Sequence, residues 1–596
     1  MWIAGVSTGH NSGVCLLKDG EIVFSVEEER LSRDKHDGGP LLSIMKILDY
    51  TDKLDYMVVT GLKYHPDSPV SSLIEYSGEP LYQGLARRLK LIKSDGREHP
   101  NLSSQVHNMF DNHHQCHSAI AFYNSGFETA VSVIVDSAGS AKKFPQIEHL
   151  MGEPVNMEDT NIYFETESFF DCSYEKGIVS IYKKMQCDNG KSFSYDETYD
   201  ADVGPEPYKL IVDEVPGIGK VWDAVTDYCG FHINECGKTM GLSAYGCEND
   251  EMPDLFIGDM GNRDLVKAYY PHRSELNVFK YKFLDDADWE REDLTKSKGR
   301  RDMSFKVQKE TQEQVLNLIL EASEMSGRKN VVLSGGYALN CVSNYYYLDK
   351  LNEHDIRLYV EPNSSDAGTA TGAALLVHYS TENCDISKRE RQKSLFLGPH
   401  YDYKDQDLEK YDVHVAETSY KEIAELIKDG NIVSIFQGRS ENGPRALGNR
   451  SILFNPSIKN GKDIVNKVKG REYFRPFAAT IMKEYAHDWF DMKGLKESPN
   501  MMYAVDVKED KKDLIPAVLH VDDTCRIQTV TKEVNEHYYN LIGEFWKLTG
   551  MPLLFNTSFN LAGDPLVETL DDAIEVLNNS ELEYCYMPEL NKLIRC

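Results

Sequence analysis

Two histidines four residues apart are the first candidates for chemistry. His113 and His117 occur in the segment HNMFDNHHQCHSAIAFYNSGF, and a spacing of four places two side chains on the same face of a helix. Two imidazoles so placed can bind one metal ion, with further ligands supplied from elsewhere in the fold. His114 is the competing partner at a spacing of three. The alternative is that these histidines only cap or decorate a polar helix.

Candidate carboxylates stand where strands are expected to end. Asp136 closes the apolar run AVSVIVD, and Asp366 lies in a loop of small residues before a helix. Two histidines with carboxylates and no thiolate suit Fe(II), Mn(II) or Zn(II) better than a sulfur-rich structural zinc site. The pattern therefore predicts a divalent metal centre.

Glycine-containing turns are candidates for phosphate binding. LSGGYALN joins a strand to a helix through Gly335 and Gly336, and such a turn lets backbone N–H groups approach a phosphate. ECGKTMGLSAYG places Gly237 beside Lys238. Neither segment has Walker or Rossmann spacing, so each could be a structural turn. Together with DAGTATGAA they favour an actin-like nucleotide site.

A basic cluster stands out in the second half of an acidic chain. FQGRSENGPRALGNRSI and VKGREYFRPFAA interleave cations with glycine, proline and aromatic residues, whereas a solvated basic face is usually a lysine-rich helix. Guanidinium groups suit bidentate binding of phosphate or carboxylate. The segment FNTSFN adds polar groups directly after an apolar strand. The residues concerned are Arg439, Arg445, Arg450, Lys469, Arg471, Arg475 and Arg526, with Asn556, Thr557, Ser558 and Asn560.

The elements expected to position these side chains alternate between strands and helices. Strands are predicted at 129–136, 329–333 and 357–360, each ending in small or acidic residues, where a sheet presents its ligand-binding edge. Periodic apolar residues predict a helix over 305–325, and the Asp-Gly pair at 19–20 predicts a hairpin turn. The pattern predicts an α/β nucleotide-binding fold.

Composition limits the class of protein. The chain has 596 residues, which suggests two to four domains, and its 65 Lys+Arg against 96 Asp+Glu give 65 − 96 = −31. That charge disfavours a large basic surface for nucleic acid. The polar stretch near residue 380 is expected to be a linker, so we predict domains at 1–378 and 396–596 joined by 379–395.

The twelve cysteines are scattered without a CxxC pair, which favours a reduced, cytoplasmic protein. No basic leader precedes the first apolar run, so a signal peptide is not expected. The apolar stretches are too short to span a bilayer, so no membrane segment is expected either.

Taken in order, the motifs resemble those of the O-carbamoyltransferase family, which includes the nodulation protein U, cephamycin and tobramycin carbamoyltransferases. The likeness covers nearly the whole chain. It rests on DGEIVFSVEEERLSRDKHD, HHQCHSA, GKTMGLSAYG, SGGYALNCVSN, DAGTATGAAL, QGRSENGPRALGNRSIL, VKGREYFRPFA, IPAVLHVDDTCRIQT and PLLFNTSFN. The resemblance implies an N-terminal actin-like ATPase-type domain and a C-terminal α/β domain resembling threonylcarbamoyl-adenylate synthase.

The resemblance also implies a two-step reaction that uses ATP and carbamoyl phosphate. The C-terminal domain would attach the carbamoyl group to AMP, releasing phosphate and pyrophosphate, and the N-terminal domain would pass it from carbamoyl-adenylate to a hydroxyl. A mixed anhydride is already electrophilic, so positioning, charge stabilisation and proton removal remain for the protein. A homodimer is a further expectation from the family.

Site residues are carried over by motif. The resemblance implies metal ligation, with Fe(II) as the first choice, by His113, His117, Asp136 and Asp366. It implies nucleotide binding by Gly237, Lys238, Gly335, Gly336 and Asn340. It implies a cradle for carbamoyl phosphate and ATP formed by Arg445, Lys469, Arg475 and Arg526, with Arg439, Arg450, Asn556 and Ser558 as further binding residues.

The chain departs from the family pattern where the acceptor hydroxyl would be activated. Gly9, His10, Asn11 and Ser12 stand where His-His-Asp-Ser is usual. By its match to a histidine of that motif, His10 is the candidate residue for the acceptor end of the site or for the general base. Asn442 replaces a common aromatic residue. The motifs do not name the acceptor, which could be a sugar or other small-molecule hydroxyl, or the hydroxymethyl group of a modified base such as 5-hydroxymethylcytosine. The alternatives are a tRNA threonylcarbamoyl-adenosine enzyme and a non-enzymatic nucleotide-binding regulator.

Overall fold

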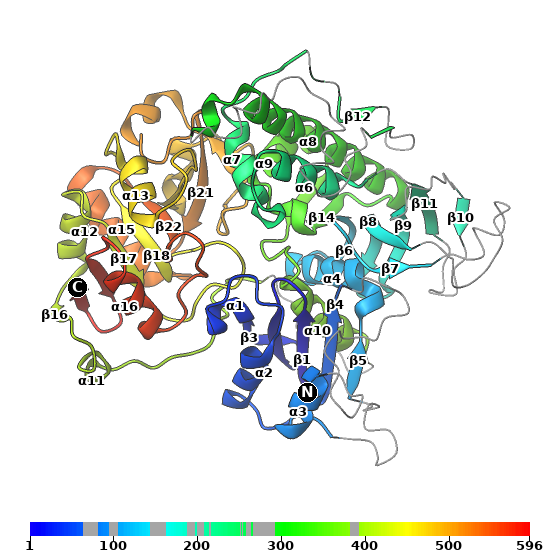
Figure 1. Cartoon of the computed structure of the whole chain (residues 1–596), viewed down its shortest axis with the longest axis horizontal. Helices are drawn as coiled ribbons and strands as arrows, with labels where there is room; N and C mark the ends of the chain where they lie inside the picture. Colours follow the sequence, from blue (N-terminus) through cyan, green and yellow to red (C-terminus); the bar gives the residue numbers. More distant parts are fainter. Residues whose placement is uncertain are drawn as a thin grey trace. The chain divides into compact units, whose positions relative to one another are not determined.

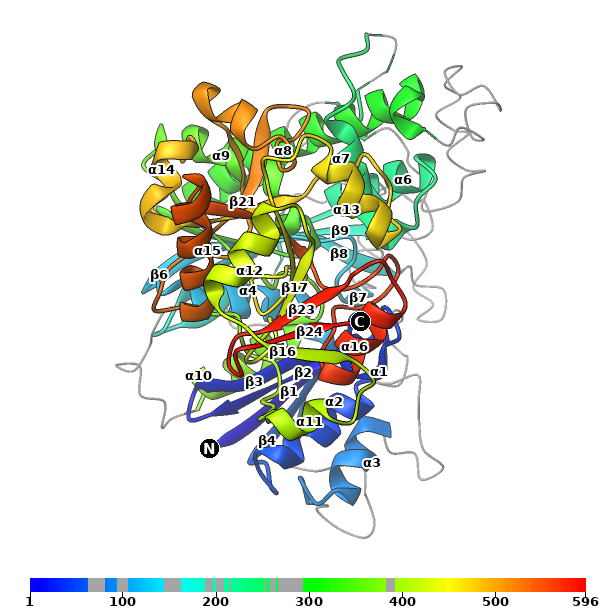
Figure 2. The same cartoon turned by 90° about the vertical axis from the view of Figure 1, so that its left-hand side faces the viewer.

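The chain folds into two compact units in a computed structural model (Figures 1 and 2). The structure describes residues 1–62, 81–93, 105–143, 162–187, 197–199, 208–213, 216–250, 252, 254–257, 264–265, 293–381 and 392–596. Unit 1 comprises Met1–Val23, Asp37–Leu339 and Lys350–Gln392, and unit 2 comprises Phe24–His36, Asn340–Asp349 and Lys393–Cys596. The division predicted from the sequence did not include the two short segments of unit 2, and residues 382–391 of the predicted linker lie outside the described residues. The predicted domain limits stay a prediction.

The first sheet of unit 1 begins with the predicted hairpin. Asp19 and Gly20 have φ values of 52° and 90°, as a two-residue turn with both central residues at positive φ requires. The sheet has the order β3-β2-β1-β4-β5, with β1 antiparallel to β2 and parallel to β4. Its strands are β1 (Trp2–Thr8), β2 (Gly13–Lys18), β3 (Glu21–Glu27), β4 (Tyr56–Gly61) and β5 (Val106–Asn108).

The second sheet of unit 1 repeats this arrangement. Within its order β10-β11-β9-β8-β6-β14-β15, strand β6 is antiparallel to β8 and parallel to β14, as β1 is to β2 and β4. Its strands are β6 (Thr129–Val135), β7 (Ala141–Lys142), β8 (Tyr163–Ser173), β9 (Gly177–Cys187), β10 (Glu197–Tyr199), β11 (Tyr208–Asp213), β14 (Asn330–Ser334) and β15 (Arg357–Val360). The duplicated topology is that of the actin-like ATPase fold, so the predicted α/β class and the actin-like domain are confirmed.

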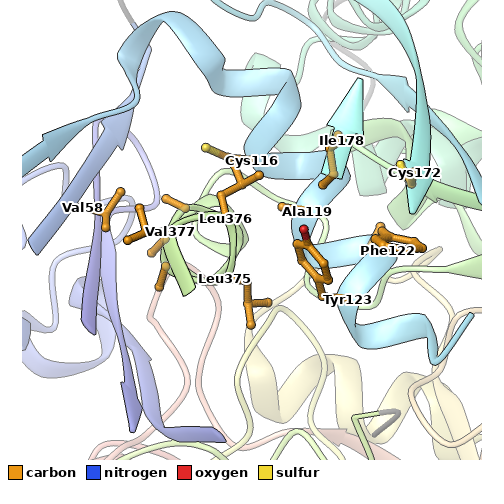
Figure 3. Close-up of a cluster of buried hydrophobic side chains, with 14 of the residues drawn as sticks. Val58, Cys116, Ala119, Phe122, Tyr123, Cys172, Ile178, Leu375, Leu376 and Val377 are labelled. Carbon is orange, nitrogen blue, oxygen red and sulfur yellow. The ribbon is translucent and has the colours of Figure 1, made fainter. Parts of the chain in front are cut away.

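Two helices pack against each other in the core of unit 1. Helix α10 (Gly368–Tyr379) lies on the first sheet, and α4 (His113–Ser125) lies on the second. Figure 3 shows Leu375, Leu376 and Val377 of α10 between Val58 of β4 and the apolar side chains of α4. This packing holds the N-termini of both helices in place.

The remaining helices of unit 1 include the longest one. The predicted helix over 305–325 forms the greater part of α8 (Lys298–Ser326), which packs against α6, α7 and β6. The others are α2 (Leu41–Lys46), α3 (Leu81–Arg88), α6 (Ile218–Tyr228), α7 (Cys236–Ser243) and the 3-10 turns η1 (Ile47–Asp49), η2 (Phe110–Asn112), η3 (Ile233–Glu235), η6 (Leu294–Lys296) and η7 (Gly336–Leu339). A short pair, β12 (Phe256–Ile257) and β13 (Asp264–Leu265), stands apart.

Unit 2 is built on one mixed sheet of order β16-β24-β23-β17-β18-β22-β19-β21-β20. Its strands are β16 (His414–Glu417), β17 (Val433–Phe436), β18 (Arg450–Phe454), β19 (Ala478–Met482), β20 (Ala504–Asp506), β21 (Thr524–Val530), β22 (Leu553–Ser558), β23 (Tyr584–Met587) and β24 (Lys592–Arg595). Its helices are α1 (Glu28–Ser32), α11 (Asp405–Leu408), α12 (Tyr420–Lys428), α13 (Gly461–Lys469), α14 (Ala486–Trp489), α15 (Glu536–Thr549), α16 (Leu570–Asn578) and the 3-10 turns η9 (Lys483–Tyr485) and η10 (Glu509–Leu514). Helix α9 (Cys341–Asn352) begins in this unit.

Two expectations from composition can be compared with the structure. Ten cysteines in the described part of the chain carry free thiols. Among the described residues, no helix has the length and apolar character needed to cross a bilayer.

Candidate active site

The four predicted metal ligands converge in unit 1. The Nε2 atoms of His113 and His117 lie 3.2 Å apart. The carboxylate oxygens of Asp136 and Asp366 lie between 3.4 and 3.6 Å from these nitrogens. One ligand atom from each of the four residues falls within 4.8 Å of every other.

Local structure explains why these four side chains meet. His113 and His117 lie in the first two turns of α4, Asp136 directly follows β6, and Asp366 precedes α10. The Asp136 Oδ1 atom accepts the backbone N–H groups of Ser137 at 2.9 Å and Gly336 at 3.2 Å. Its other oxygen is therefore held toward the histidines. The glycine loop predicted for phosphate thus lies against a metal-ligand candidate.

The two histidines and two aspartates shift one another's pKa values toward the charged forms. Burial disfavours the imidazolium form of His113, but the charge of Asp366 and hydrogen bonds from both carboxylates raise its pKa to about 10. Burial alone would raise the pKa of Asp136, yet hydrogen bonds from His113 and His117 lower it well below its usual range. The two carboxylates thus favour positive charge at the histidines, which a bound cation would also supply.

The residues fit a divalent metal ion. Ligands about 2.1 Å from one ion lie about 3.0–3.4 Å from each other in octahedral or tetrahedral geometry, close to the separations seen here. The donor set of two imidazoles and two carboxylates contains no thiolate, as Fe(II), Mn(II) or Zn(II) sites prefer. His113, His117, Asp136 and Asp366 would hold the ion.

His10 lies beside this cluster, at the turn after β1. Its Nε2 atom is 3.6 Å from Asp366 Oδ2, the oxygen that faces away from the histidine pair. Asn11 has a φ of 61° and its Oδ1 atom lies 3.4 Å from His10 Nδ1. The Gly9 and Ser12 N–H groups donate to Gly38 and Asp37 carbonyls, at 3.2 Å each. The turn is thus tied down with His10 directed at Asp366.

The competing histidine, His114, points elsewhere. Its Nδ1 atom lies 2.8 Å from Ser168 Oγ on β8. Burial lowers the pKa of His114 to about 4. Because successive helical positions are turned by about 100°, the residue next to His113 faces the sheet instead of the metal-ligand cluster.

A second site lies in unit 2, where cations gather. The Lys469 ammonium is buried and hydrogen-bonds only neutral oxygens in the described residues: the Ser558 carbonyl and hydroxyl, and the Asn560 carbonyl at 2.7 Å and Oδ1 at 3.0 Å. Burial, then the charges of Arg471 and Arg475, lower the pKa of Lys469 well below its usual range. A cation so placed is stabilised by an incoming anion.

The arginines of this cluster act on one another in the same way. Burial, then the charge of Arg526, lower the pKa of Arg445. Burial, then the charges of Arg475 and Arg526, lower the pKa of Arg471. Arg475 forms an ion pair with Glu472 at 3.4 Å. We call Arg445, Lys469, Arg471, Arg475 and Arg526 the cationic cluster.

One face of the unit 2 sheet carries Asn556 in the same row as Arg526 of the cationic cluster. Asn556, Ala478 and Arg526 are register partners on β22, β19 and β21, so their side chains share one face. Asn556 Nδ2 donates to the Ala446 carbonyl at 3.3 Å and to Thr480 Oγ1 at 2.9 Å. Its Oδ1 atom is buried and has no hydrogen-bond partner among the described residues. Ala478, between Asn556 and Arg526, is buried in a small apolar cluster with Leu395, Leu447 and Met501.

Two predicted binding arginines bind the protein's own backbone. The Arg439 guanidinium donates to the carbonyls of Gly398 and Leu397, at 2.6 Å each. Arg450 is fully buried, donates to the carbonyls of Gln437, Gly438, Asn449 and Glu568, and stacks over the Phe436 ring at 3.8 Å. The structure groups neither with the cationic cluster.

The other residues predicted to bind the nucleotide lie at the start of α7, in the turn after β14 and before α9. Lys238 Nζ is 2.6 Å from Glu235 and 5.6 Å from the centroid of Phe231, while Gly237 faces open space. Asn340 Oδ1 accepts the Ser343 N–H at 3.1 Å, which is an N-cap contact for α9. Gly335 needs its φ of 87° and its lack of a side chain, because a Cβ would overlap the Val135 carbonyl.

Sequence reasoning missed two residues that shape the Arg445 loop. Glu441 Oε1 accepts the N–H groups of Leu447 at 2.7 Å, Asn449 at 2.9 Å and Arg450 at 3.2 Å. Arg30, from α1, donates to the Gly443 carbonyl at 2.6 Å. Glu441 stands inside the quoted motif QGRSENGPRALGNRSIL, so an acid within a basic run was the available signal. Nothing local in the sequence indicates Arg30.

The duplicated actin-like fold of unit 1 carries the four metal-ligand candidates, and unit 2 carries the cationic cluster. The carbamoyltransferase N-terminus model matches residues 2–66 and 89–375, and the carbamoyltransferase C-terminus model matches residues 424–592. The chain belongs to the carbamoyltransferase family, which confirms the family recognised from its motifs and makes it a carbamoyltransferase enzyme.

The chain is also similar to individual proteins, over different shares of its length. The nodulation protein NolNO of Sinorhizobium fredii is 29% identical over 598 residues, covering 96% of this chain and 77% of that protein. The nodulation protein U of Rhizobium tropici is 34% identical over 252 residues, covering 41% of each. Among solved structures, full-length HypF in its phosphate- and nucleotide-bound form is 15% identical with a TM-score of 0.34, covering 64% of this chain and 56% of that one.

Proposed function

We propose that the chain is an ATP-dependent O-carbamoyltransferase that uses carbamoyl phosphate and forms carbamoyl-adenylate. The observation that carries this proposal is the cationic cluster, in which buried and partly buried cations lower one another's pKa values with few carboxylates to balance them. Such a cluster suits a polyanion, and ATP with carbamoyl phosphate supplies several phosphates. Because the chain belongs to the carbamoyltransferase family, the transferred group is the carbamoyl group.

In the first step, water cleaves carbamoyl phosphate into carbamate and inorganic phosphate. A carbamate oxygen then forms a bond to the α-phosphorus of ATP, and the bond from that phosphorus to pyrophosphate breaks, which gives carbamoyl-adenylate. Arg445, Lys469, Arg475 and Arg526 stabilise the negative charge on both departing groups. The unpartnered Asn556 Oδ1 is an acceptor suited to the carbamoyl NH2 group, which has two N–H donors.

In the second step, the acceptor hydroxyl attacks the carbamoyl carbon, and the bond to AMP breaks. His10 is the candidate to take the hydroxyl proton, since it lies beside Asp366 with its Nε2 directed there. The Gly335–Gly336 turn presents backbone N–H groups for the AMP phosphate. When bound, a divalent metal ion supplies Lewis-acid charge beside that phosphate or the carbonyl. The acceptor is a sugar or small-molecule hydroxyl, or the hydroxymethyl group of a modified nucleobase.

The adenylation step tests this function directly. The purified chain is incubated with carbamoyl phosphate, ATP, Fe(II) and a panel of hydroxyl acceptors, while AMP, pyrophosphate and carbamoylated product are measured. Arg475→Ala and Arg526→Ala are expected to lower adenylate formation by at least about 100-fold, because each removes a charged contact to the phosphates. The matched control, Arg595→Ala, changes an arginine that is 58% exposed and should leave the rate unchanged.

Failure of the wild-type chain to form carbamoyl-adenylate under any of these conditions would contradict the proposal. A strict requirement for threonine and bicarbonate in place of carbamoyl phosphate would instead favour the threonylcarbamoyl-adenosine alternative. If both arginine variants keep their activity and circular dichroism shows an intact fold, the cationic cluster does not take part in the reaction.

A further inference from the structure

A second group of buried charges lies in unit 1, outside the metal-ligand cluster. Lys183 on β9 hydrogen-bonds Glu165 on β8, and the Nζ atom of Lys142 on β7 lies 3.9 Å from the same Glu165 oxygen. The side chains of Glu165, Lys183 and Lys142 are 0%, 8% and 14% exposed. Two ammonium groups thus share one carboxylate, and this trio carries one excess positive charge.

Lys142 is the member of the trio whose positive charge is not paired with Glu165 by a hydrogen bond. A separation of 3.9 Å is too long for a hydrogen bond, and within the described part of the chain the Lys142 ammonium group donates no hydrogen bond to an oxygen. Burial, then the charge of Lys183, lower the pKa of Lys142 to about 8, against the opposing pull of Glu165 and Asp111. A largely buried ammonium without an acceptor is costly unless a ligand supplies the anion.

The trio is connected to the metal-ligand cluster through one serine. The Ser140 N–H donates to Glu165 Oε2 at 3.2 Å, and Ser140 Oγ accepts the His113 N–H at 3.2 Å. Ser140 lies in the loop between Asp136, at the end of β6, and Lys142. The same loop therefore carries a metal-ligand candidate at one end and the excess cation at the other.

We propose that Lys142 and Lys183 form an oxyanion subsite that binds a phosphate or carboxylate group of the acceptor. This inference rests on the proposed function and deepens it, because it makes the acceptor an anionic molecule that bears a hydroxyl. An oxyanion would give Lys142 the hydrogen-bond acceptor it lacks and would neutralise the excess charge of the trio. Glu165 holds Lys183 in place while leaving Lys142 available.

Residue-resolved labelling of lysine amines tests the subsite on the full chain without any substrate. An amine-reactive reagent is applied across pH 6–11, and the labelling of each lysine is followed by mass spectrometry. Lys142 is expected to label with a midpoint near pH 8, well below the ordinary value of 10.5. Added inorganic phosphate is expected to slow its labelling several-fold at pH 8 and to move the midpoint upward, because a bound anion favours the charged amine.

Labelling is compared in phosphate, acetate and chloride at equal ionic strength, to distinguish which kind of anion binds. Protection by phosphate alone indicates a phosphate monoester, protection by acetate as well indicates a general oxyanion site, and equal protection by chloride contradicts the proposal. Lys183→Gln should abolish the protection, whereas Lys183→Arg, which keeps the charge, should retain it if the fold is intact. Lys143→Gln, at the next position, is the matched control and should not alter protection of Lys142.

The outcomes are separable from those of the proposed function. Absence of labelling at Lys142 up to pH 11, or labelling that phosphate does not change, would overturn the subsite whether or not the chain forms carbamoyl-adenylate. Protected Lys142 in a chain that forms no carbamoyl-adenylate would instead contradict the proposed function. In the acceptor panel, we expect phosphorylated or carboxylated hydroxyl compounds to be used at least about tenfold more efficiently than neutral analogues.

Discussion

At the scale of single residues, the histidine pair of α4 illustrates how far spacing alone can predict chemistry. Positions four apart on a helix share a face, so His113 and His117 present their Nε2 atoms 3.2 Å apart. Asp136 and Asp366 follow elements that could be recognised from the sequence, and they complete the set. His114 could only be excluded by seeing that its ring contacts Ser168.

The protons of this cluster lead to a pH prediction. The pKa of His113 is raised to about 10 in the metal-free protein by Asp366 and Asp136, so at neutral pH its proton must leave when a metal ion binds. Metal affinity should therefore rise as pH increases from 6 to 9, with proton release. Titration calorimetry with Mn(II) in two buffers of different ionisation enthalpy measures both quantities.

A variant of one metal-ligand candidate, Asp366, tests whether these residues hold the metal ion. Asp366→Asn removes the charge that raises the His113 pKa and a ligand oxygen, so Mn(II) affinity should fall by about 100-fold or more. His354→Gln, at an exposed position of the same unit, is the control and should bind normally. An affinity that is independent of pH, or a normal affinity for Asp366→Asn, would show that these four residues do not hold the ion.

At the scale of elements, small residues let α10 approach its neighbours closely enough to bring Asp366 to the histidines. A Cβ on Gly372 would overlap the carbonyl oxygen of Cys116 on α4, and a Cβ on Gly5 of β1 would overlap that of Ala370. The segment DAGTATGAAL was recognised from the sequence as a nucleotide-type loop. Its additional role, as the contact surface between α10 and α4, depends on partners more than 200 positions away in the chain.

Gly372→Ala tests this contact. The added methyl group must separate α10 from α4, so we expect a loss of about 1–3 kcal/mol in the free energy of unfolding and weaker metal binding. Gly543→Ala is a matched control, because a Cβ there meets open space on α15 and alanine favours a helix by about 1 kcal/mol. Chemical denaturation of both variants gives the comparison. Unchanged stability of Gly372→Ala would show that the helices can separate without cost.

At the scale of the whole molecule, the two units are not consecutive stretches of chain. Phe24–His36 and Asn340–Asp349 belong to unit 2, although the sequences around them belong to unit 1. Arg30 from the first segment donates to the Gly443 carbonyl, and Tyr345 from the second donates to the Asp491 carbonyl at 3.0 Å. The loop that carries Arg445 therefore depends on a residue more than 400 positions earlier.

Arg30→Met tests this dependence. Arg30 is 2% exposed and is surrounded by the charges of Glu27, Glu568 and Glu441, so its removal should destabilise unit 2 by about 3–5 kcal/mol. Hydrogen exchange measured by mass spectrometry should become faster in residues 441–450. The exposed control Arg595→Met should leave exchange in that loop unchanged, and protection retained in Arg30→Met would contradict the proposed support of the loop.

The sequence by itself determined the strands, the long helix, the histidine spacing, the hairpin turn and the family, because each depends on periodicity or motif within a short stretch. The tertiary structure decided which charged side chains meet. Arg439 and Arg450 bind backbone carbonyls, Glu441 and Arg30 shape the Arg445 loop, and Lys142 is left beside Glu165 with an excess charge. The physical reason is that burial and long-range packing set the partner of a charge, and neither is encoded in local spacing.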